Sequence, residues 1–257
     1  MANRTLRLTS FAVTLLLGLA SVAQAENRLE NISTRGDVQT GDGVLIGGFI
    51  IDGITAKTVL IRARGPSLAE AGVLGTLTDP MVTLHRVTGE LLDSNDSWMN
   101  HARSGEIPAG LAPTHATEAA IIATLDPGAY TPIVSGADGG TGVGIVEVFE
   151  VDTQARLQNI STRGFVGSGD NVMIGGFIIE GGTPKTIIMR GRGPSLADAG
   201  VDGALMDPML TLTRPDGTFV DSNDNYSAHA GATNLPSQFV PRNTNEAVIM
   251  TTLDPGA

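Results

Sequence analysis

The sequence has no cysteine among its 257 residues, so disulfide bonds, thiol catalysis and cysteine–zinc sites are all excluded. Aromatic residues are scarce, at one Trp, two Tyr and seven Phe. Basic residues are also few, since 16 Lys and Arg face 27 Asp and Glu and leave a net charge of −11. An acidic surface repels nucleic acid and anionic membranes, so we expect neither as a partner.

Residues 1–25 have the pattern of a secretory signal peptide. Arg4 and Arg7 precede the apolar run 11–20, and small residues follow up to Ala25. The run is shorter than the roughly 20 residues that span a bilayer, so we expect cleavage after Ala25 and no membrane insertion afterwards. Removing two of the 16 basic residues leaves 14 against 27 acidic ones, a net charge of −13. These features predict a secreted, cell-surface or periplasmic protein whose stability depends on hydrophobic packing or a bound metal.

The rest of the chain is two tandem copies of one unit. Residues 28–53 recur at 156–181, and each equivalent pair lies 128 positions apart, as Arg28 and Arg156 do. A period this long suggests domains rather than the short repeats of a solenoid. We assign the first unit to residues 26–153 and the second unit to residues 154–257, which is truncated because it stops before the equivalent of 130–152.

Each unit reads as short β-branched or alternating segments separated by Gly, Asp and Pro turns. In the first unit the expected strands are 44–51, 57–64, 81–86, 90–93, 119–125, 130–135 and 144–151. The one helical candidate, 67–72, is too short to cover a parallel sheet. We therefore predict an all-β protein of two tandem antiparallel β-sandwich, jelly-roll-like domains, the second lacking its last strands.

A unit without those strands would expose unpaired sheet edges and core. We expect the chain to be a fragment of a longer protein, whose other domains would be partners. The alternative is that a strand from elsewhere completes the second sandwich by addition.

The segments 81–95 and 119–151 carry a resemblance to a known family. Leu125, Gly128, Ala129 and Tyr130 stand where that family turns into a strand, and the pattern resembles the pre-peptidase C-terminal domain and related bacterial secreted modules. The first half of each unit is similar to a repeat of exported bacterial proteins with no assigned role. The resemblance implies a non-catalytic accessory module, sometimes linked to calcium or carbohydrate binding.

Two further features are candidates for binding. A loop of oxygen donors at a strand end could hold calcium, although Asp and Asn there could equally form turns with their own backbone. An exposed aromatic residue after that loop could stack on a glycan, although a buried core anchor is the preferred interpretation. The repeated His101 and His229 have no second histidine at ligand spacing, so zinc is not expected. The calcium candidates are Asp93, Asn95, Asp96, Asp221, Asn223 and Asp224, and the aromatic candidates are Trp98 and Tyr226.

Two motifs have a catalytic and a structural interpretation. Ser67, and Ser195 in the second unit, stand where a serine hydrolase could place its nucleophile, but the spacing to Glu70 favours a helix cap. Arg62 and Arg64, with equivalents Arg190 and Arg192, could bind an anion, but pairing with Asp79 or Glu118 is preferred.

The sequence therefore predicts a non-catalytic structural or adhesive accessory module of an exported bacterial protein, with no obligatory cofactor. The alternatives are a carbohydrate- or calcium-binding module, with an extracellular glycan or protein as partner, and a serine hydrolase.

Overall fold

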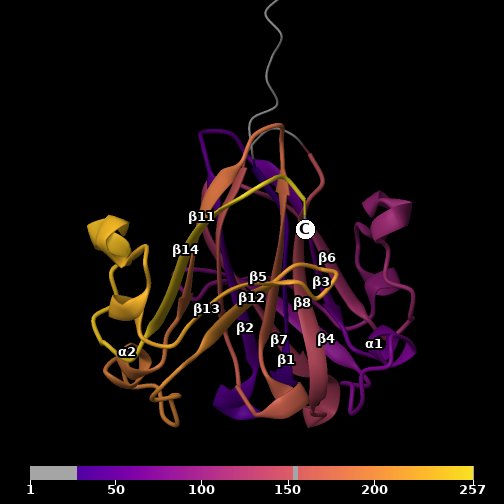
Figure 1. Ribbon diagram of the computed structural model, residues 1–257. Coiled ribbons are helices and arrows are strands. Elements are labelled where there is room, and N and C mark those ends of the chain that lie inside the picture. The colour runs from indigo at the N-terminus through magenta and orange to yellow at the C-terminus, as the bar shows by residue number, and fades with distance from the viewer. Residues whose placement is uncertain (1–27, 153–155, 257) are drawn as a thin grey trace, which may run out of the picture.

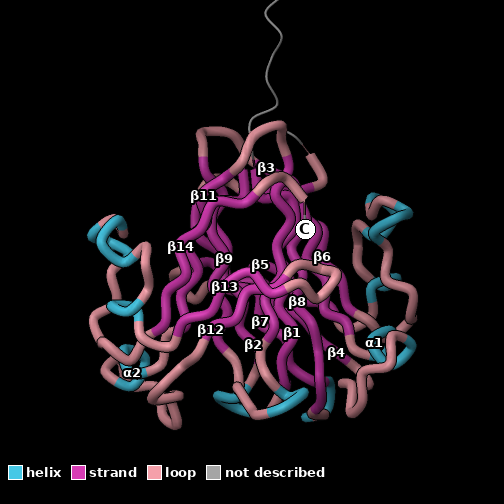
Figure 2. The backbone as a smooth tube through the Cα atoms, viewed as in Figure 1, coloured by secondary structure: helices cyan, strands magenta, loops and turns pink. Residues whose placement is uncertain are grey.

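The computed structural model describes residues 28–152 and 156–256. The expected signal peptide, 1–25, lies outside the described residues. The fold is all-β, with short helices confined to the connections (Figure 1, Figure 2). None of the described helices is long and apolar enough to cross a membrane.

The first unit contains eight strands in two antiparallel sheets. One sheet has the order β1-β8-β3-β6 and the other has the order β2-β7-β4-β5. Successive strands alternate between the two sheets, apart from the β4–β5 hairpin within one sheet, and this winding of a jelly roll confirms the predicted fold class. The strands are β1 (Arg28–Val38), β2 (Leu45–Asp52), β3 (Lys57–Arg64), β4 (Pro80–Arg86), β5 (Leu91–Asn95), β6 (Ala119–Leu125), β7 (Gly128–Gly136) and β8 (Gly142–Glu150).

The strand β1 was not predicted from the sequence. Its backbone alternates between buried and half-buried positions, but two of the buried ones are Thr34 and Gly36. A small polar residue and a glycine hide the period-2 apolar pattern that identifies a half-buried strand.

The core lies between the two sheets of the first unit. Phe49 and Tyr130 stack at its centre with ring centroids 5.6 Å apart. Around them pack fully buried aliphatic side chains, each contributing about 1.5–3 kcal/mol by leaving water. The principal ones are Leu45, Val59, Ile61, Val82, Leu84 and Ile121.

A smaller cluster covers the outer face of the sheet at β3, β6 and β8. Leu60, Ile122 and Phe149 form it with Ala120, and the loop between β5 and β6 packs over it through Trp98 and other side chains. Both faces of β3 are therefore largely buried, one by the core between the sheets and the other by this loop.

The second unit repeats six of these strands among the described residues. β11 pairs with β14 and β12 pairs with β13, each as a separate two-stranded sheet. Equivalents of β7 and β8 are not present in the described part of this unit, as expected. The strands are β9 (Arg156–Arg163), β10 (Ile174–Glu180), β11 (Lys185–Gly191), β12 (Leu210–Thr213), β13 (Phe219–Asn223) and β14 (Ala247–Leu253).

The helices are single turns in the loops. The α-helices are α1 (Pro66–Glu70) and α2 (Pro194–Ala197), at opposite sides of the molecule in Figure 1. The 3-10 turns are η1 (Gly41–Gly43), η2 (Trp98–Asn100), η3 (Ser104–Glu106), η4 (Ala109–Leu111), η5 (Ala137–Gly139), η6 (Gly169–Asn171), η7 (Tyr226–Ala228), η8 (Ala232–Asn234) and η9 (Ser237–Phe239).

The two units join edge to edge through their first two strands. β1 pairs with β10 and β2 pairs with β9, both antiparallel. The register is the same in both ladders, since Ile32 opposite Phe177 corresponds to Ile160 opposite Phe49. Each five-stranded sheet, β5-β4-β7-β2-β9 and β10-β1-β8-β3-β6, thus takes its fifth strand from the second unit.

Candidate functional site

The helix α1 begins at the motif Gly65–Pro66–Ser67. A Cβ on Gly65 would lie 1.9 Å from the carbonyl oxygen of Leu77, so only glycine fits there. Pro66 occupies the first turn, where its missing N–H costs no helical hydrogen bond. The buried carboxylate of Glu118 accepts hydrogen bonds from the amides of Gly65, at 3.2 Å, and Ser67, at 3.0 Å. A glutamate just before β6 therefore caps this helix.

The prediction that Ser67 caps the helix, with Glu70 reaching back, is wrong. The N-cap residue is Gly65, which has no side chain to cap the helix. Glu70 is exposed. The Ser67 hydroxyl instead donates to Glu118 and accepts from Arg64 Nη2 at 2.7 Å. The second unit repeats the arrangement in Arg192, Gly193, Ser195 and Glu246.

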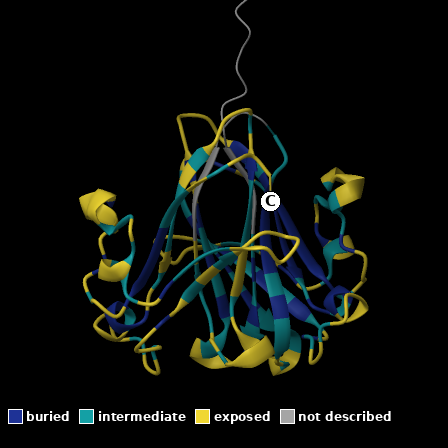
Figure 3. Cartoon of the chain, viewed as in Figure 1, coloured by how far each residue is buried: buried dark blue, intermediate teal, exposed yellow. Residues whose placement is uncertain are grey.

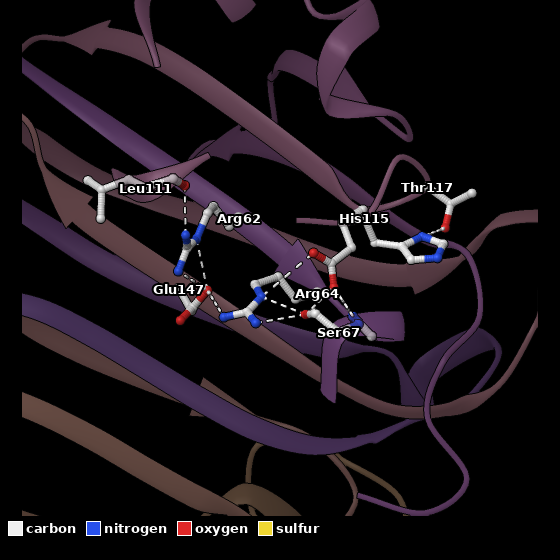
Figure 4. A network of polar contacts seen from close by, with 9 residues as sticks. Arg62, Arg64, Ser67, Leu111, His115, Thr117 and Glu147 are labelled. Atoms are coloured by element: carbon white, nitrogen blue, oxygen red, sulfur yellow. Dashed lines mark hydrogen bonds and ion pairs between the residues drawn. The ribbon is translucent and has the colours of Figure 1, made fainter. Parts of the chain in front are cut away.

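Two arginines extend this network across the sheet (Figure 4). Arg62 Nη2 lies 2.7 Å from the carboxylate of Glu147 on β8, and its Nη1 donates to the carbonyl of Leu111 at 2.6 Å. Arg64 lies 3.7 Å from both Glu147 and Glu118. The expected pairing of Arg64 with Glu118 is confirmed, whereas Asp79 takes no part in the described ion pairs. These contacts make the network a set of internally compensated charges rather than an open anion site.

Glu147 was missed by the sequence analysis. Its one signal is that it interrupts the apolar run of β8, at a position opposite Arg62 in the β3–β8 ladder. A buried carboxylate in such a strand needs a cationic partner, and only the strand order reveals which cation lies beside it.

Ser67 is not part of a serine–histidine pair among the described residues. The side chain is 5% exposed, and its hydroxyl hydrogen bonds to a carboxylate while an arginine donates to its oxygen. His115 is exposed and contacts Thr117 at 3.1 Å, and no hydrogen bond joins a histidine to Ser67 in the described part of the chain (Figure 4). The one described base within hydrogen-bond reach of the hydroxyl is the Glu118 carboxylate, which also accepts two backbone amides at the helix start.

The expected calcium ligands Asp93, Asn95 and Asp96 lie at the end of β5 but do not converge. Asp93 Oδ2 lies 3.0 Å from His101 Nε2, a contact that the sequence analysis did not anticipate. Asn95 is buried and accepts a hydrogen bond from the Ala120 amide at 2.9 Å, which ties β5 to β6. Asp96 is exposed.

The second unit repeats each of these contacts. Asp221 lies 2.9 Å from His229, and buried Asn223 accepts from the Val248 amide at 2.8 Å, while Asp224 is exposed. No group of three or more His, Asp or Glu residues placed to hold a metal ion occurs among the described residues. Calcium binding remains a prediction, and a calcium ion here would need backbone and amide oxygens as ligands in addition to carboxylates.

The two aromatic candidates lie against the sandwich. Trp98 is half-buried and packs on the outer cluster of β3, β6 and β8, and its indole nitrogen is buried without a hydrogen-bond partner among the described residues. Tyr226, its equivalent, is also half-buried. Packing accounts for most of the Trp98 ring, which leaves less of its face for stacking on a sugar.

A shallow groove of about 320 Å³ lies beside this loop in the first unit. Asp93 contributes a carboxylate to it, and Arg86 and Arg103 contribute cationic side chains. Apolar side chains Leu84, Leu92 and Leu125 form part of its lining. Asp93 is therefore a calcium candidate that borders a concavity.

The fold places the chain in the class of all-β proteins, with two jelly-roll units joined edge to edge. The chain matches no protein-family model, and no curated protein or solved structure is significantly similar to it. The resemblance to the pre-peptidase C-terminal domain therefore stays a prediction.

Proposed function

We propose that this chain is a non-catalytic structural or adhesive module of an exported protein. The observation that carries the proposal is the use of the repeated polar motifs, because Ser67, Glu118 and Asn95 each bond to another strand or helix of the same unit. A structural role for these residues, in holding strands and helices together, explains why the polar motifs occur in both units without invoking a catalytic site.

The two ladders β1–β10 and β2–β9 also support a structural role. They join the units through backbone hydrogen bonds along two strands each. A rigid pair of units transmits force or sets a distance, which suits an extracellular spacer or adhesive module.

Export and the absence of hydrolysis are tested together. We expect the full chain, expressed in a bacterial host, to be exported and to begin at Glu26, as read by mass spectrometry of the intact protein. We expect no hydrolysis of a panel of nitrophenyl esters and peptide amides. Hydrolysis that is lost in Ser67→Ala, with the fold retained by circular dichroism, would contradict the proposal.

A ligand-binding module is the second candidate, favoured by the groove beside Asp93. Thermal unfolding with and without millimolar calcium, followed by a glycan-array screen, tests it. A rise in the unfolding midpoint that disappears in Asp93→Asn, but not in Asp216→Asn on an exposed turn, would support this candidate.

A further inference from the structure

The first unit contains a fully buried lysine beside two carboxylates. Lys57 is the first residue of β3, and its side chain is 0% exposed. Its Nζ lies 3.2 Å from Oδ1 of Asp152, just after β8, and 3.4 Å from Oε2 of Glu150, at the end of β8. Buried residues follow the strands of this unit, whereas the exposed ones lie mostly in the loops (Figure 3). An amine and a carboxyl group are therefore held in contact where bulk water has little access.

The backbone holds these two groups opposite each other. β3 and β8 form an antiparallel ladder, and it continues beyond β8 because the Val151 amide donates to the Thr58 carbonyl at 3.2 Å. Residue 152 then falls opposite residue 57 in the register, and Lys57 Nζ also donates to the backbone carbonyl of Asp152 at 3.1 Å. Their contact follows from the pairing of the strands, so it needs no rearrangement of the sheet.

The Asp152 carboxylate is placed as an electrophile would be. Its Oδ2 accepts a hydrogen bond from the Thr58 amide, and its Oδ1 faces the nitrogen of Lys57. A backbone N–H on one oxygen stabilises the negative charge that this oxygen carries when a nucleophile adds to the carbon. Oδ1 is then the oxygen that can leave, and it lies beside the amine.

Glu150 supplies a proton acceptor for the amine. Its carboxylate is 1% exposed, and its Oε2 contacts Lys57 Nζ. A lysine amine is a nucleophile only after it has lost a proton, and a carboxylate in contact with it can take that proton. The same carboxyl group can then protonate the departing oxygen of Asp152, because that oxygen contacts the same nitrogen.

Burial favours a neutral product over the ion pair. Two charges taken out of water keep an unfavourable desolvation free energy, and replacing such a pair by uncharged groups of similar volume is often stabilising. Condensation would convert the charges of Lys57 and Asp152 into one uncharged amide. The Asp152 side chain is 26% exposed, which gives the released water molecule a path to the solvent.

We propose that Lys57 and Asp152 form an intramolecular amide bond, with Glu150 as the group that transfers the proton. Nζ bonds to Cγ of Asp152, and the bond between Cγ and Oδ1 breaks. The ammonium gives up two protons, one of them through Glu150, and the departing oxygen leaves with both as water, so the step is balanced without an oxidant or reductant. The contacts described above are those of the unreacted pair. The reaction occurs once in each chain rather than as turnover of a substrate, and it does not depend on the exported structural role.

The mass of the intact, denatured chain tests the proposal. We expect a mass lower by one water molecule than the mass calculated from the sequence for the N-terminus that is found. Lys57→Arg and Asp152→Ala should have the calculated mass. Asp152→Asn should lose one ammonia molecule instead, because the amide nitrogen of asparagine then departs. The sequence has one other lysine, so Lys185→Arg is the matched control and should keep the loss of water.

Tryptic peptides locate the bond. Trypsin does not cleave after a lysine whose amine is part of an amide, so we expect residues 36–62 to be linked to residues 104–156. Glu150→Gln, with the fold retained by circular dichroism, should show this linked pair in only a minor fraction of the molecules. The reason is that a glutamine side chain cannot accept the lysine proton.

The outcomes that would contradict the proposal are distinct. A wild-type mass equal to the calculated one would overturn it and leave Lys57 as an ion-pair partner only. A loss of water that persists in Lys57→Arg would also overturn it, because the water would then come from cyclisation of an aspartate onto the backbone. A linked pair that forms as completely in Glu150→Gln would overturn the role of Glu150.

Discussion

The hydroxyls of Thr34 and Thr162 lie 2.8 Å apart and hydrogen bond to each other across the junction of the two units. The two threonines are equivalent residues of the repeat, 128 positions apart, so their contact marks a pseudo-two-fold axis. The matching registers of the β1–β10 and β2–β9 ladders follow from the same symmetry.

Replacing both threonines by valine tests the importance of this contact. We expect Thr34→Val with Thr162→Val to lower the free energy of unfolding by about 0.5–1.5 kcal/mol, the usual net value of one hydrogen bond. Urea denaturation followed by circular dichroism measures it. The control is Thr58→Val with Thr124→Val, an exposed hydroxyl pair at 3.0 Å, which should change stability less. Equal effects in the two pairs would show that burial at the junction adds nothing.

Glu118 should matter far more than Glu70. Replacing Glu118 by alanine leaves two helix-start amides without their acceptor and removes one of the two carboxylates beside Arg64, so we expect a loss of about 3–5 kcal/mol. Glu70→Ala removes an exposed side chain and should stay within about 0.5 kcal/mol. Urea unfolding midpoints compare the two. A large effect of Glu70→Ala would restore the capping box that the sequence predicted.

Asn95 and Asp96 separate a structural role of the loop from a calcium site. Asn95→Ala breaks the bond to the buried Ala120 amide and should cost about 1–3 kcal/mol in calcium-free buffer. Asp96→Ala should have almost no effect there, because its side chain is exposed. Differential scanning calorimetry with a chelator present measures both. A loss with Asp96→Ala that appears only when calcium is added would identify a cation ligand.

Lys57 and its equivalent Lys185 should respond differently to replacement by methionine. Lys57 is fully buried and lies 3.4 Å from Glu150 and 3.2 Å from Asp152. Lys57→Met leaves a buried carboxylate without its cationic partner and should lower the free energy of unfolding by about 3–5 kcal/mol. Lys185 is half-buried, and the second unit offers no described counterpart of β8, so Lys185→Met should change the thermal midpoint little. Similar losses in both variants would mean that the ion pair contributes nothing beyond packing of the lysine stem.

Much of the fold was predictable because its signals are local. Strand 57–64 and strand 119–125 were predicted with the observed bounds, since β-branched runs flanked by Gly, Asp and Pro allow few other structures. The repeat was readable from residue spacing alone. The strand β1 was not, because Thr34 and Gly36 interrupt its apolar alternation.

The candidate site was less predictable, because its partners come from distant parts of the chain. Ser67 and Glu70 have the spacing of a capping box, yet Glu118 reaches the helix start and takes that role. The pairing of Asp93 with His101 depends on how the loop after β5 folds back. A local sequence pattern shows which polar groups need a hydrogen-bond or ion-pair partner, but not which residue supplies it in the folded chain.

By itself the sequence determined the all-β class and the two units, because periodicity, turn chemistry and internal repetition can be read along the chain without knowledge of the strand order. Only the tertiary structure decided that β1 and β2 pair with β10 and β9, and that Glu147 compensates Arg62 while Arg190 has no such carboxylate among the described residues. These relationships depend on strand order. Which strands form hydrogen bonds with each other cannot be read from either strand's sequence, so the edge-to-edge joining of the two units is a property of the assembled sheets.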